Sequence, residues 1–252
     1  GQNFLQDHRI IYNLLAAIEA TPGQHWVEIG PGQGALTEPL LKSGIDLDVI
    51  ELDRDLVALL GKKFSRHENL HIHSGDALAF DFNMLIKPEE QLRIIGNLPY
   101  NISTPLMFHL MKFAGNIHDM HFMLQKEVVD RICAQPGNKK YGRLSIMLQY
   151  YCESSHLFDV PPESFKPSPK IMSAIVKLIP YKQPPVLIDK IDDLNLIVMQ
   201  AFSQRRKTLR NSLKKLLTER EIIELDIDPM LRAESISLRD YAKLSNFLST
   251  KE

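Results

Sequence analysis

The chain has 252 residues, of which 44% are hydrophobic and 24% charged, a composition typical of a globular protein with room for one large domain and a small one. No apolar stretch approaches the roughly 18 residues that a membrane-spanning helix needs, and no signal peptide pattern is present, so we expect a cytoplasmic protein without a membrane segment. The formal net charge of −1 argues against a protein that binds nucleic acid through its overall charge. The two cysteines, Cys133 and Cys152, lack CxxC spacing, which favours reduced thiols over a disulfide or a zinc site.

Short apolar runs alternate with helical patterns over the first 180 residues. The runs predict strands at 26–29, 47–50, 70–73, 92–95, 121–124 and, after a stiff loop with four prolines at 161–169, at 173–179. The patterns between them predict helices at 9–20, 35–43, 54–64 and 104–113. Strands separated by helices predict βαβ units and therefore a parallel sheet with right-handed crossovers.

The remainder of the chain is helical in pattern. Predicted helices cover residues 190–204, 205–218, 219–225 and 237–249, and Ser237 with Asp240 predicts a capping box. We therefore expect an α/β domain over residues 1–182 and a small helical domain over residues 183–252.

A glycine-rich turn, EIGPGQG at residues 28–34, joins the first predicted strand to a helix. The turn contains three glycines, Gly30, Gly32 and Gly34. Glycine at such positions allows a sharp turn and a close approach of a ligand to the backbone. About 20 residues later Glu51 ends the second strand, where a carboxylate can accept both hydroxyls of a ribose. On these residues alone NAD and S-adenosylmethionine are nearly level, and a turn that needs glycine without a ligand is the remaining alternative.

Asp76 follows the third strand, in the segment SGDA. Its carboxylate could accept from an adenine amino group in the same cleft. The alternative is an N-cap for a short helix.

The segment Asn97-Leu98-Pro99-Tyr100 follows the fourth strand and decides between the cofactors. An exocyclic amine on an aromatic base is a poor nucleophile, because its lone pair is delocalised into the ring. Acceptors for its hydrogens, from the Asn97 side chain and the Leu98 carbonyl, would localise that lone pair, while Tyr100 would stack on the base. Because a methyltransferase needs such a set and a nicotinamide enzyme does not, the segment favours S-adenosylmethionine, with no metal and no covalent nucleophile.

At this point the chain resembles the small-subunit (16S) ribosomal RNA adenine N6-dimethyltransferases, the KsgA/RsmA family. The resemblance covers nearly the whole chain and rests on GQNFLQD at 1–7, VEIGPGQGALT at 27–37, GNLPYNISTPL at 96–106, FKPSPK at 165–170 and AFSQRRKTLRNSL at 201–213, with shorter matches at 49–53, 75–78, 123–128 and 141–145. It implies a Rossmann-like class I methyltransferase sheet, mostly parallel with its last strand antiparallel, followed by a helical domain. Members usually carry a basic segment before GQNFL, and we expect that the first residues of the natural product are missing here.

The resemblance also implies a reaction and a set of residues. The expected reaction is dimethylation of two adjacent adenosines near the 3′ end of 16S rRNA in the immature 30S subunit, with S-adenosylhomocysteine as the second product and a role in ribosome biogenesis; we expect a monomer. By motif match the cofactor site would be lined by Asn3, Leu5, Gly30, Glu51, Asp76 and Asn97. The target adenine would face Asn97, Leu98 and Tyr100, with Phe165 stacking on its other side. From the residues alone, Phe165 could equally pack back onto the core.

A basic run at residues 201–215 contains six cations and no acidic residue. At helical spacing its leucines share one face and its cations fall mostly on others, which is also the pattern of an ordinary solvated helix. With no acidic residue nearby to pair, we expect contact with RNA phosphates through Arg205, Arg206, Lys207 and Arg210.

Two rival functions remain open. A 23S rRNA adenine methyltransferase of the antibiotic-resistance type shares the cofactor and adenine motifs, although the Phe165 loop and the QRRKTLRNSL segment favour the small-subunit family. An RNA-binding ribosome assembly factor is the other alternative, and the presence of both Asn97 and Glu51 argues that catalysis is retained.

Overall fold

The computed structural model describes residues 3–99 and 101–251, which fold into two compact units. Unit 1 comprises Gly1–Val129 and Glu153–Pro180, and unit 2 comprises Asp130–Cys152 and Tyr181–Glu252. The chain thus passes from unit 1 to unit 2, returns for the last strands, and enters unit 2 again. The predicted division into domains at residue 182 stays a prediction.

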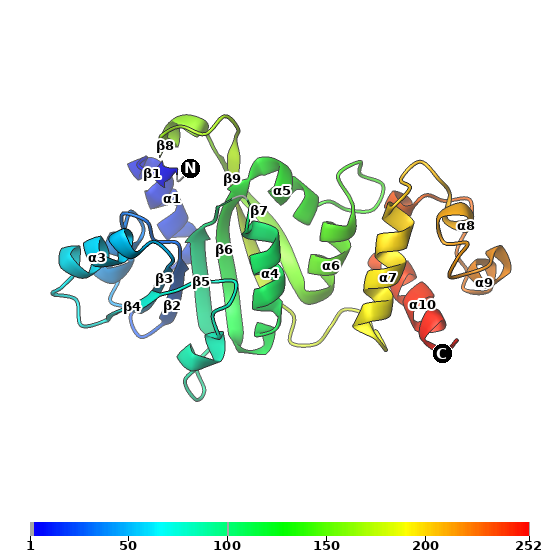
Figure 1. Ribbon diagram of the computed structural model, residues 1–252, viewed down its shortest axis with the longest axis horizontal. Coiled ribbons are helices and arrows are strands. Elements are labelled where there is room, and N and C mark those ends of the chain that lie inside the picture. The colour runs from blue at the N-terminus through cyan, green and yellow to red at the C-terminus, as the bar shows by residue number, and fades with distance from the viewer. Residues whose placement is uncertain (1–2, 100, 252) are drawn as a thin grey trace. The chain divides into compact units, whose positions relative to one another are not determined.

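Unit 1 is built on a seven-stranded sheet with the order β4-β3-β2-β5-β6-β9-β7 (Figure 1). Its strands are β2 His25–Ile29, β3 Asp46–Glu51, β4 Leu70–Ser74, β5 Leu92–Asn97, β6 Ile117–Gln125, β7 Cys152–Val160 and β9 Ser173–Pro180. The neighbours from β4 to β6 run parallel, whereas β9 is antiparallel to β6. This confirms the predicted Rossmann-like sheet, mostly parallel with an antiparallel last strand.

Helices connect these strands, and the first four of them confirm the predicted helices, whereas the fifth was not predicted. They are α1 His8–Ile18, α2 Thr37–Lys42, α3 Arg54–Lys63, α4 Ser103–Met111 and α5 Lys126–Ile132, with short 3-10 turns η1 Phe82–Leu85 and η2 Ala114–Asn116. Asp7 and Asp53 begin α1 and α3 by accepting backbone N–H bonds in the first turn. Apolar side chains of α1 and α2 pack on those of the central strands, so the carboxyl ends of β2, β3 and β5 are held at one edge of a rigid core.

The structure has three strands that the sequence pattern did not predict, namely β7 in the main sheet and two short strands in the early and proline-rich segments. β1 Phe4–Leu5 pairs antiparallel with β8 Phe165–Lys166, which follows the turn η3 Pro162–Ser164. The carbonyl oxygen of Ser164 also accepts from the N–H of Gln6 at 2.8 Å. The predicted loop at 161–169 is therefore partly ordered by the start of the chain, a long-range partner that no local pattern reveals.

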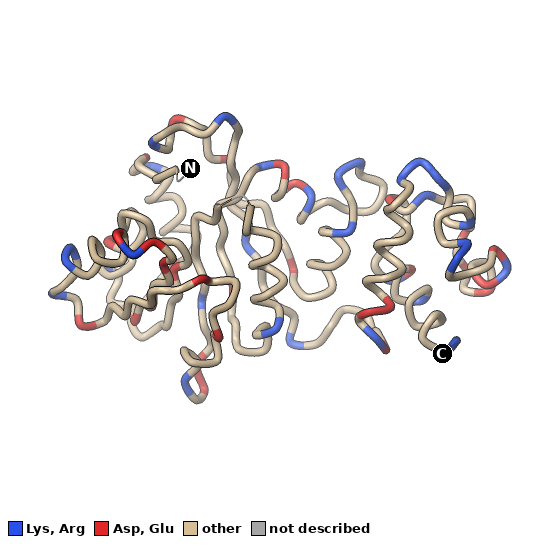
Figure 2. Tube along the Cα trace, in the orientation of Figure 1, with Lys and Arg blue, Asp and Glu red and all other residues tan. Residues whose placement is uncertain are grey.

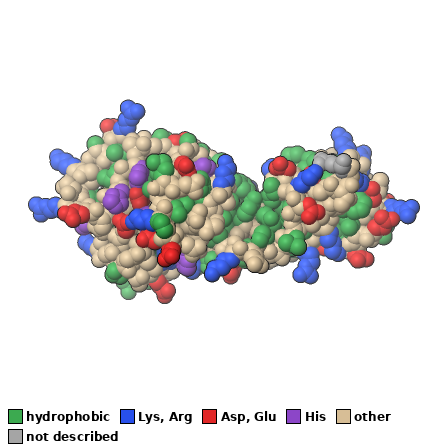
Figure 3. Space-filling view, turned by 90° about the horizontal axis from the view of Figure 1, so that it is seen from below, with side chains coloured by type: hydrophobic (Ala, Val, Ile, Leu, Met, Phe, Trp, Pro, Cys, Tyr) green, Lys and Arg blue, Asp and Glu red, His purple; other side chains and the backbone are tan. Residues whose placement is uncertain are grey.

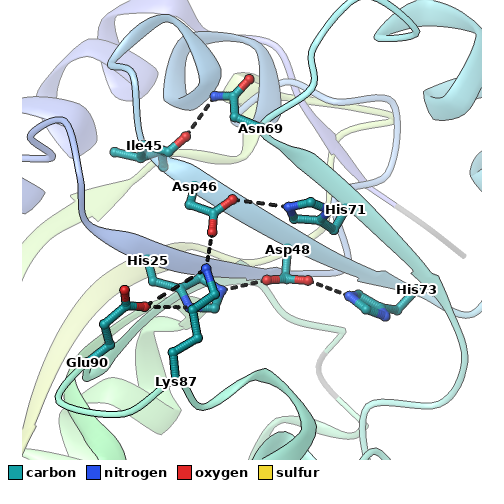
Figure 4. A network of polar contacts seen from close by, with 9 residues as sticks. All are labelled: His25, Ile45, Asp46, Asp48, Asn69, His71, His73, Lys87 and Glu90. Carbon is teal, nitrogen blue, oxygen red and sulfur yellow. Dashed lines mark hydrogen bonds and ion pairs between the residues drawn. The ribbon is translucent and has the colours of Figure 1, made fainter.

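A polar network joins the neighbouring strands β2, β3 and β4 near one edge of the sheet (Figure 4). Asp48 accepts from His25 Nε2 at 2.5 Å and from His73, while Lys87 donates to Asp46 at 2.5 Å. Burial raises the pKa of Asp48, but the hydrogen bonds from the two histidines outweigh it and hold that pKa below its usual value. All histidines of the sequence lie in unit 1, and several show on its surface among acidic and basic side chains in Figure 3.

Unit 2 is helical. It contains α6 Arg143–Tyr151, α7 Ile191–Phe202, α8 Leu209–Ser212, α9 Glu219–Glu224, the 3-10 turn η4 Ala233–Ser235 and α10 Leu238–Ser249. The predicted capping box at the start of α10 is confirmed, since Ser237 Oγ accepts from the Asp240 N–H and an Asp240 oxygen from the Ser237 N–H.

The predicted helix over 205–218 is wrong. Only α8 is helical there, because N–H groups at its start donate elsewhere: Leu209 to the Leu231 carbonyl at 2.8 Å and Arg210 to that of Pro229 at 3.1 Å. The basic residues before Thr208 consequently lie in turns rather than on a helix face.

Candidate active site

A cavity of about 990 Å³ lies at the carboxyl ends of β2, β3 and β5 in unit 1. This is where ligands bind in open α/β sheets, and the volume suits a nucleoside-sized ligand. The cavity brings together most of the residues that the sequence assigns to the cofactor or the adenine: Asn3, Leu5, Gly30, Glu51, Asn97, Leu98 and Phe165.

The glycine-rich turn forms one wall of the cavity. Gly30, Gly32 and Gly34 all have positive φ, at +68°, +56° and +83°. A Cβ on Gly32 would lie 3.0 Å from the ring of Phe4, and one on Gly34 would lie 2.7 Å from the ring of Phe64. Glycine is required here both by the backbone conformation and by the aromatic rings that pack against the turn.

Glu51 is buried, and its two carboxylate oxygens have different backbone donors. The Gly32 N–H donates to Oε2 at 3.2 Å, and the Asp53 N–H donates to Oε1 at 3.0 Å. These bonds fix the carboxylate beside the glycine-rich turn and leave further lone pairs on both oxygens. The arrangement fits the hydroxyl pair of a ribose.

Glu28 is a second buried carboxyl in the cavity wall, and it was not among the site residues predicted from the sequence. Thr37 Oγ1 donates to its Oε2 at 2.6 Å. Burial raises the pKa of Glu28 to about 7, with the nearby Glu51 charge adding to the rise and the Thr37 bond opposing it. An acidic residue inside the apolar run at 26–29 was the signal that could have drawn attention to it.

Asn97 ends β5 and reaches the first residues of the chain. Its Nδ2 donates to the Asn3 carbonyl oxygen at 3.2 Å. A carbonyl can only accept, so this bond fixes the orientation of the amide and turns Oδ1 away as an acceptor. No residue in the described ranges donates to Oδ1, which agrees with the predicted role toward an amine.

Leu98 is buried, and its N–H donates to the Met123 carbonyl at 3.2 Å, which extends the β5–β6 pairing by one residue. No donor to the Leu98 carbonyl is found among the described residues. The side chain anchors the loop in the core while its backbone oxygen remains an acceptor. Tyr100, the predicted stacking residue, lies outside the described residues.

Phe165 lines the cavity and also belongs to the core. It lies opposite Leu5 in the β1–β8 pair and is only 5% exposed, packed within the main apolar cluster. The structure therefore has Phe165 in the packed arrangement that the sequence left as an alternative to base stacking.

Asp76 lies outside the residues that line this cavity. It is exposed, and its Oδ1 accepts from the Leu78 N–H at 2.9 Å, so it caps a turn rather than a helix. Its backbone neighbour Gly75 donates to the Glu51 carbonyl at 2.9 Å, which keeps Asp76 close to the end of β3.

The predicted RNA-binding residues Arg205, Arg206, Lys207 and Arg210 are all exposed in unit 2. The expectation that no acidic residue pairs with them is wrong for two of the four. Arg205 meets Glu234 at 3.2 Å and Arg210 meets Glu219 at 3.3 Å. Both carboxylates come from later segments, so the count of charges within the run could not reveal them.

Two kinds of feature are absent from the described ranges. No group of three or more His, Cys, Asp and Glu residues at positions 3–99 and 101–251 is arranged to hold a metal ion. Within the same residues, no helix has both the length and the apolar character needed to cross a membrane.

Comparison with known proteins places the chain in a family. Residues 1–250 match the family described as ribosomal RNA adenine dimethylase. The chain is 55% identical over 249 residues to the ribosomal RNA small subunit methyltransferase A of Pseudomonas aeruginosa, covering 99% of this chain and 93% of the relative. A dimethyladenosine transferase from Plasmodium falciparum has a similar structure, with a TM-score of 0.80 at 25% identity over 98% of both chains.

The fold is shared more widely. The 23S rRNA methyltransferase ErmE is similar with a TM-score of 0.77 at 23% identity, covering 98% of this chain and 100% of the other. That identity supports a common fold only. The match over nearly the full length and the identity to the Pseudomonas protein together show that this chain belongs to the ribosomal RNA adenine dimethylase family.

Proposed function

We propose that this protein transfers methyl groups from S-adenosylmethionine to N6 of two adjacent adenosines near the 3′ end of 16S rRNA. The substrate would be the immature 30S particle, and each adenosine would be dimethylated. The observation that carries the proposal is the orientation of Asn97, whose Nδ2 bond to Asn3 leaves Oδ1 as an acceptor at the cavity wall. Family membership supports adenine in ribosomal RNA as the target.

The residues present fit S-adenosylmethionine. Glu51 would hold the ribose, and Gly30 with Asn3 and Leu5 would border the rest of the cofactor. When bound, the cofactor supplies a methyl group carried on a sulfonium sulfur. The leaving group is the neutral thioether S-adenosylhomocysteine. Asp76, near the end of β3, remains our candidate for the adenine amino group of the cofactor.

The chemistry left to the protein is positioning and polarisation. Asn97 Oδ1 and the Leu98 carbonyl would accept the hydrogens of the target amine and so direct its lone pair toward the methyl group. Tyr100 would stack on one face of the base. Phe165 is packed in the core but lines the cavity, and from that position it would border the other face. The base must be unstacked to reach these groups, as for any enzyme that modifies a base.

The basic segment at 205–210 in unit 2 is proposed to bind RNA phosphates. Because Arg205 and Arg210 are paired with Glu234 and Glu219, about three cations are expected to make such contacts, and the slope of log affinity against log salt should then be roughly −2 to −3. The double reversal Arg206→Glu/Lys207→Glu should weaken binding to 30S particles and flatten that slope. Unchanged affinity and slope would remove this segment from the RNA interface.

The rival with 23S rRNA as substrate is not favoured. The relatives that share more than half of this sequence bear the small-subunit name, whereas the 23S enzyme shares 23%. These relatives are bacterial proteins, which supports action in the cytoplasm, where bacterial ribosomes are assembled. A monomeric state stays a prediction.

The test is methyl transfer from labelled cofactor to unmethylated 30S and 50S particles, followed by nucleoside analysis. We expect N6,N6-dimethyladenosine from 30S particles alone. Label in 50S particles, or none with wild-type protein, would contradict the proposed substrate.

A further inference from the structure

Two basic loops of unit 2 are held together by hydrogen bonds. One is the segment 137–143 that leads into α6, and the other is the segment 203–208 that follows α7. Lys and Arg residues gather at both loops in Figure 2. They are far apart in sequence, so their joint arrangement depends on the contacts between them.

Arg205 and Glu234 join the two loops, and we refer to this pair as the junction. Arg205 Nη2 donates to the Lys139 carbonyl oxygen at 2.6 Å and to Glu234 Oε2 at 3.2 Å. The Gly137 N–H donates to the Glu234 carbonyl oxygen at 2.7 Å. One arginine and one glutamate thus connect the 137–143 loop, the 203–208 loop and the turn η4.

The parts that meet at this junction are themselves anchored in the unit. Tyr141 is fully buried and its ring lies 6.5 Å from that of Phe202 at the end of α7. Tyr241 of α10 donates its hydroxyl to the Ala233 carbonyl at 2.8 Å, which holds η4. The junction therefore packs on buried aromatic side chains, which fix the position of the Lys139 backbone.

Not every cation around the junction is available to a ligand. Lys140 pairs with Asp130 at 2.7 Å and Arg210 with Glu219 at 3.3 Å, and Arg205 is engaged as described. Lys139, Arg206 and Lys207 are exposed, and none of the three side chains forms an ion pair with a described residue. The three come from the two joined loops.

We propose that Arg205 is a positioning residue and that Lys139, Arg206 and Lys207 together form the surface that contacts RNA phosphates. This inference rests on the proposed function. Arg205 uses its guanidinium to hold the Lys139 segment, and Glu234 holds Arg205 in turn. Ordering two loops before RNA arrives lowers the entropic cost of placing three cations at once.

The role of Glu234 separates this arrangement from simple charge attraction. If only net charge mattered, Glu234→Ala would strengthen RNA binding, because it removes an anion and releases Arg205. If Glu234 holds the junction, the same substitution weakens binding. The two explanations therefore predict opposite signs for one variant.

The experiment measures binding of the full chain to unmethylated 30S particles at several salt concentrations. Glu219→Ala is the matched control, since it also removes an exposed partner of an arginine but has no link to the 137–143 loop. We expect Glu234→Ala to raise Kd about 5- to 10-fold, and Glu219→Ala to leave Kd unchanged or lower it. Glu234→Asp, which can still accept from Arg205, should recover part of the loss.

Three further readouts exclude a general loss of structure. Glu234→Ala should raise KM for 30S particles while leaving kcat and the Kd for S-adenosylmethionine unchanged. In combination with Lys139→Gln its effect should be clearly less than additive, since both remove the same contact. The salt slope should fall by roughly the one contact that Lys139 makes.

Binding of Glu234→Ala that is as tight as wild type, or tighter, overturns the inference while wild-type methylation of 30S particles still supports the proposed function. Full additivity with Lys139→Gln overturns it as well. A wild-type protein that neither binds nor methylates 30S particles overturns both.

Discussion

The side-chain amide of Asn97 donates to the backbone carbonyl of Asn3 at 3.2 Å, across 94 residues of sequence. This bond joins the end of β5 to the first described residue of the chain and assigns the two ends of the amide different tasks. The nitrogen is bonded to the N-terminal segment at the cavity wall, and the oxygen is left as the acceptor that we propose for the substrate amine.

Asn97→Ala should lower kcat about 100-fold or more at saturating cofactor, since loss of one preorganised polar group in an active site costs roughly 10²–10³ in rate. Asn97→Asp should not restore activity, because a carboxylate oxygen would face the Asn3 carbonyl. The measurement is dimethyladenosine formation on 30S particles, with the exposed Asn83→Ala as control. Full activity of Asn97→Ala would contradict the mechanism.

Glu51→Ala and Glu51→Gln should both weaken binding of S-adenosylmethionine. A hydrogen bond to a charged group is worth about 1.5–3 kcal/mol, so the Kd should rise roughly 10- to 100-fold. The amide introduced by Glu51→Gln would also leave one of the two backbone donors, Gly32 or Asp53, without its carboxylate partner. Calorimetric titration checks this, with the exposed Asp55→Asn as control; an unchanged Kd means that Glu51 does not hold the ribose.

Gly96→Ala should destabilise unit 1. A Cβ at this position would lie 2.7 Å from the Ile29 carbonyl oxygen, where β5 and β2 pair side by side. Overpacking of this kind costs about 1–3 kcal/mol. Trp26 is the single tryptophan and is buried in unit 1, so its fluorescence during denaturant unfolding reports the change. Gly115→Ala, with open space around the new methyl, should unfold like wild type.

Glu28→Gln should stabilise the protein more at alkaline than at acidic pH. The folded-state pKa of Glu28 is raised to about 7 by burial, above its ordinary value of 4.5. Because its pKa is raised, Glu28 binds a proton more tightly in the folded state than in the unfolded state. Below pH 4.5 the carboxyl is protonated in both states and does not destabilise the fold. As the pH rises from 4.5 through 7, the free energy of unfolding falls. The full penalty is about 3 kcal/mol from the difference of the two pKa values.

Unfolding followed by Trp26 fluorescence at about pH 5 and about pH 8.5 tests this, without cofactor. The increase in the free energy of unfolding caused by Glu28→Gln should be about 2.5 kcal/mol larger at the higher pH than at the lower. Glu38→Gln is the control, because hydrogen bonding to Lys42 lowers the pKa of that exposed carboxyl and it is ionised throughout. An equal increase in the free energy of unfolding at both pH values would show that Glu28 stays ionised in the folded protein.

The strand and helix patterns predicted most of unit 1 because each element buries an apolar face that the sequence periodicity displays. The glycine-rich turn and Glu51 were predictable for a similar reason: their spacing follows from the βαβ unit that separates them. The Asn97 segment was predictable from chemistry, since its residue types are those an amine requires.

What the sequence could not reveal depends on partners far along the chain. Helix 205–218 failed because Leu231 and Pro229 accept the N–H groups that would begin it. The pairing of Arg205 with Glu234 arises from the same cause, since an ion pair between distant segments leaves no mark in the local charge count. The composition of a loop does not predict the burial of its side chains, as Phe165 illustrates. A stiff proline-rich loop suggested an exposed ring, but the strand pairing of Phe165 with Leu5 places the ring in the core.

The pairing of β1 with β8 has a consequence for synthesis of the protein on the ribosome. Phe4 and Leu5 are translated before every strand of the main sheet, yet their partners Lys166 and Phe165 emerge only after six of those strands. The wall that these segments form cannot exist on a shorter nascent chain. The protein is therefore unable to complete this wall of its cavity until a ribosome has made nearly all of unit 1.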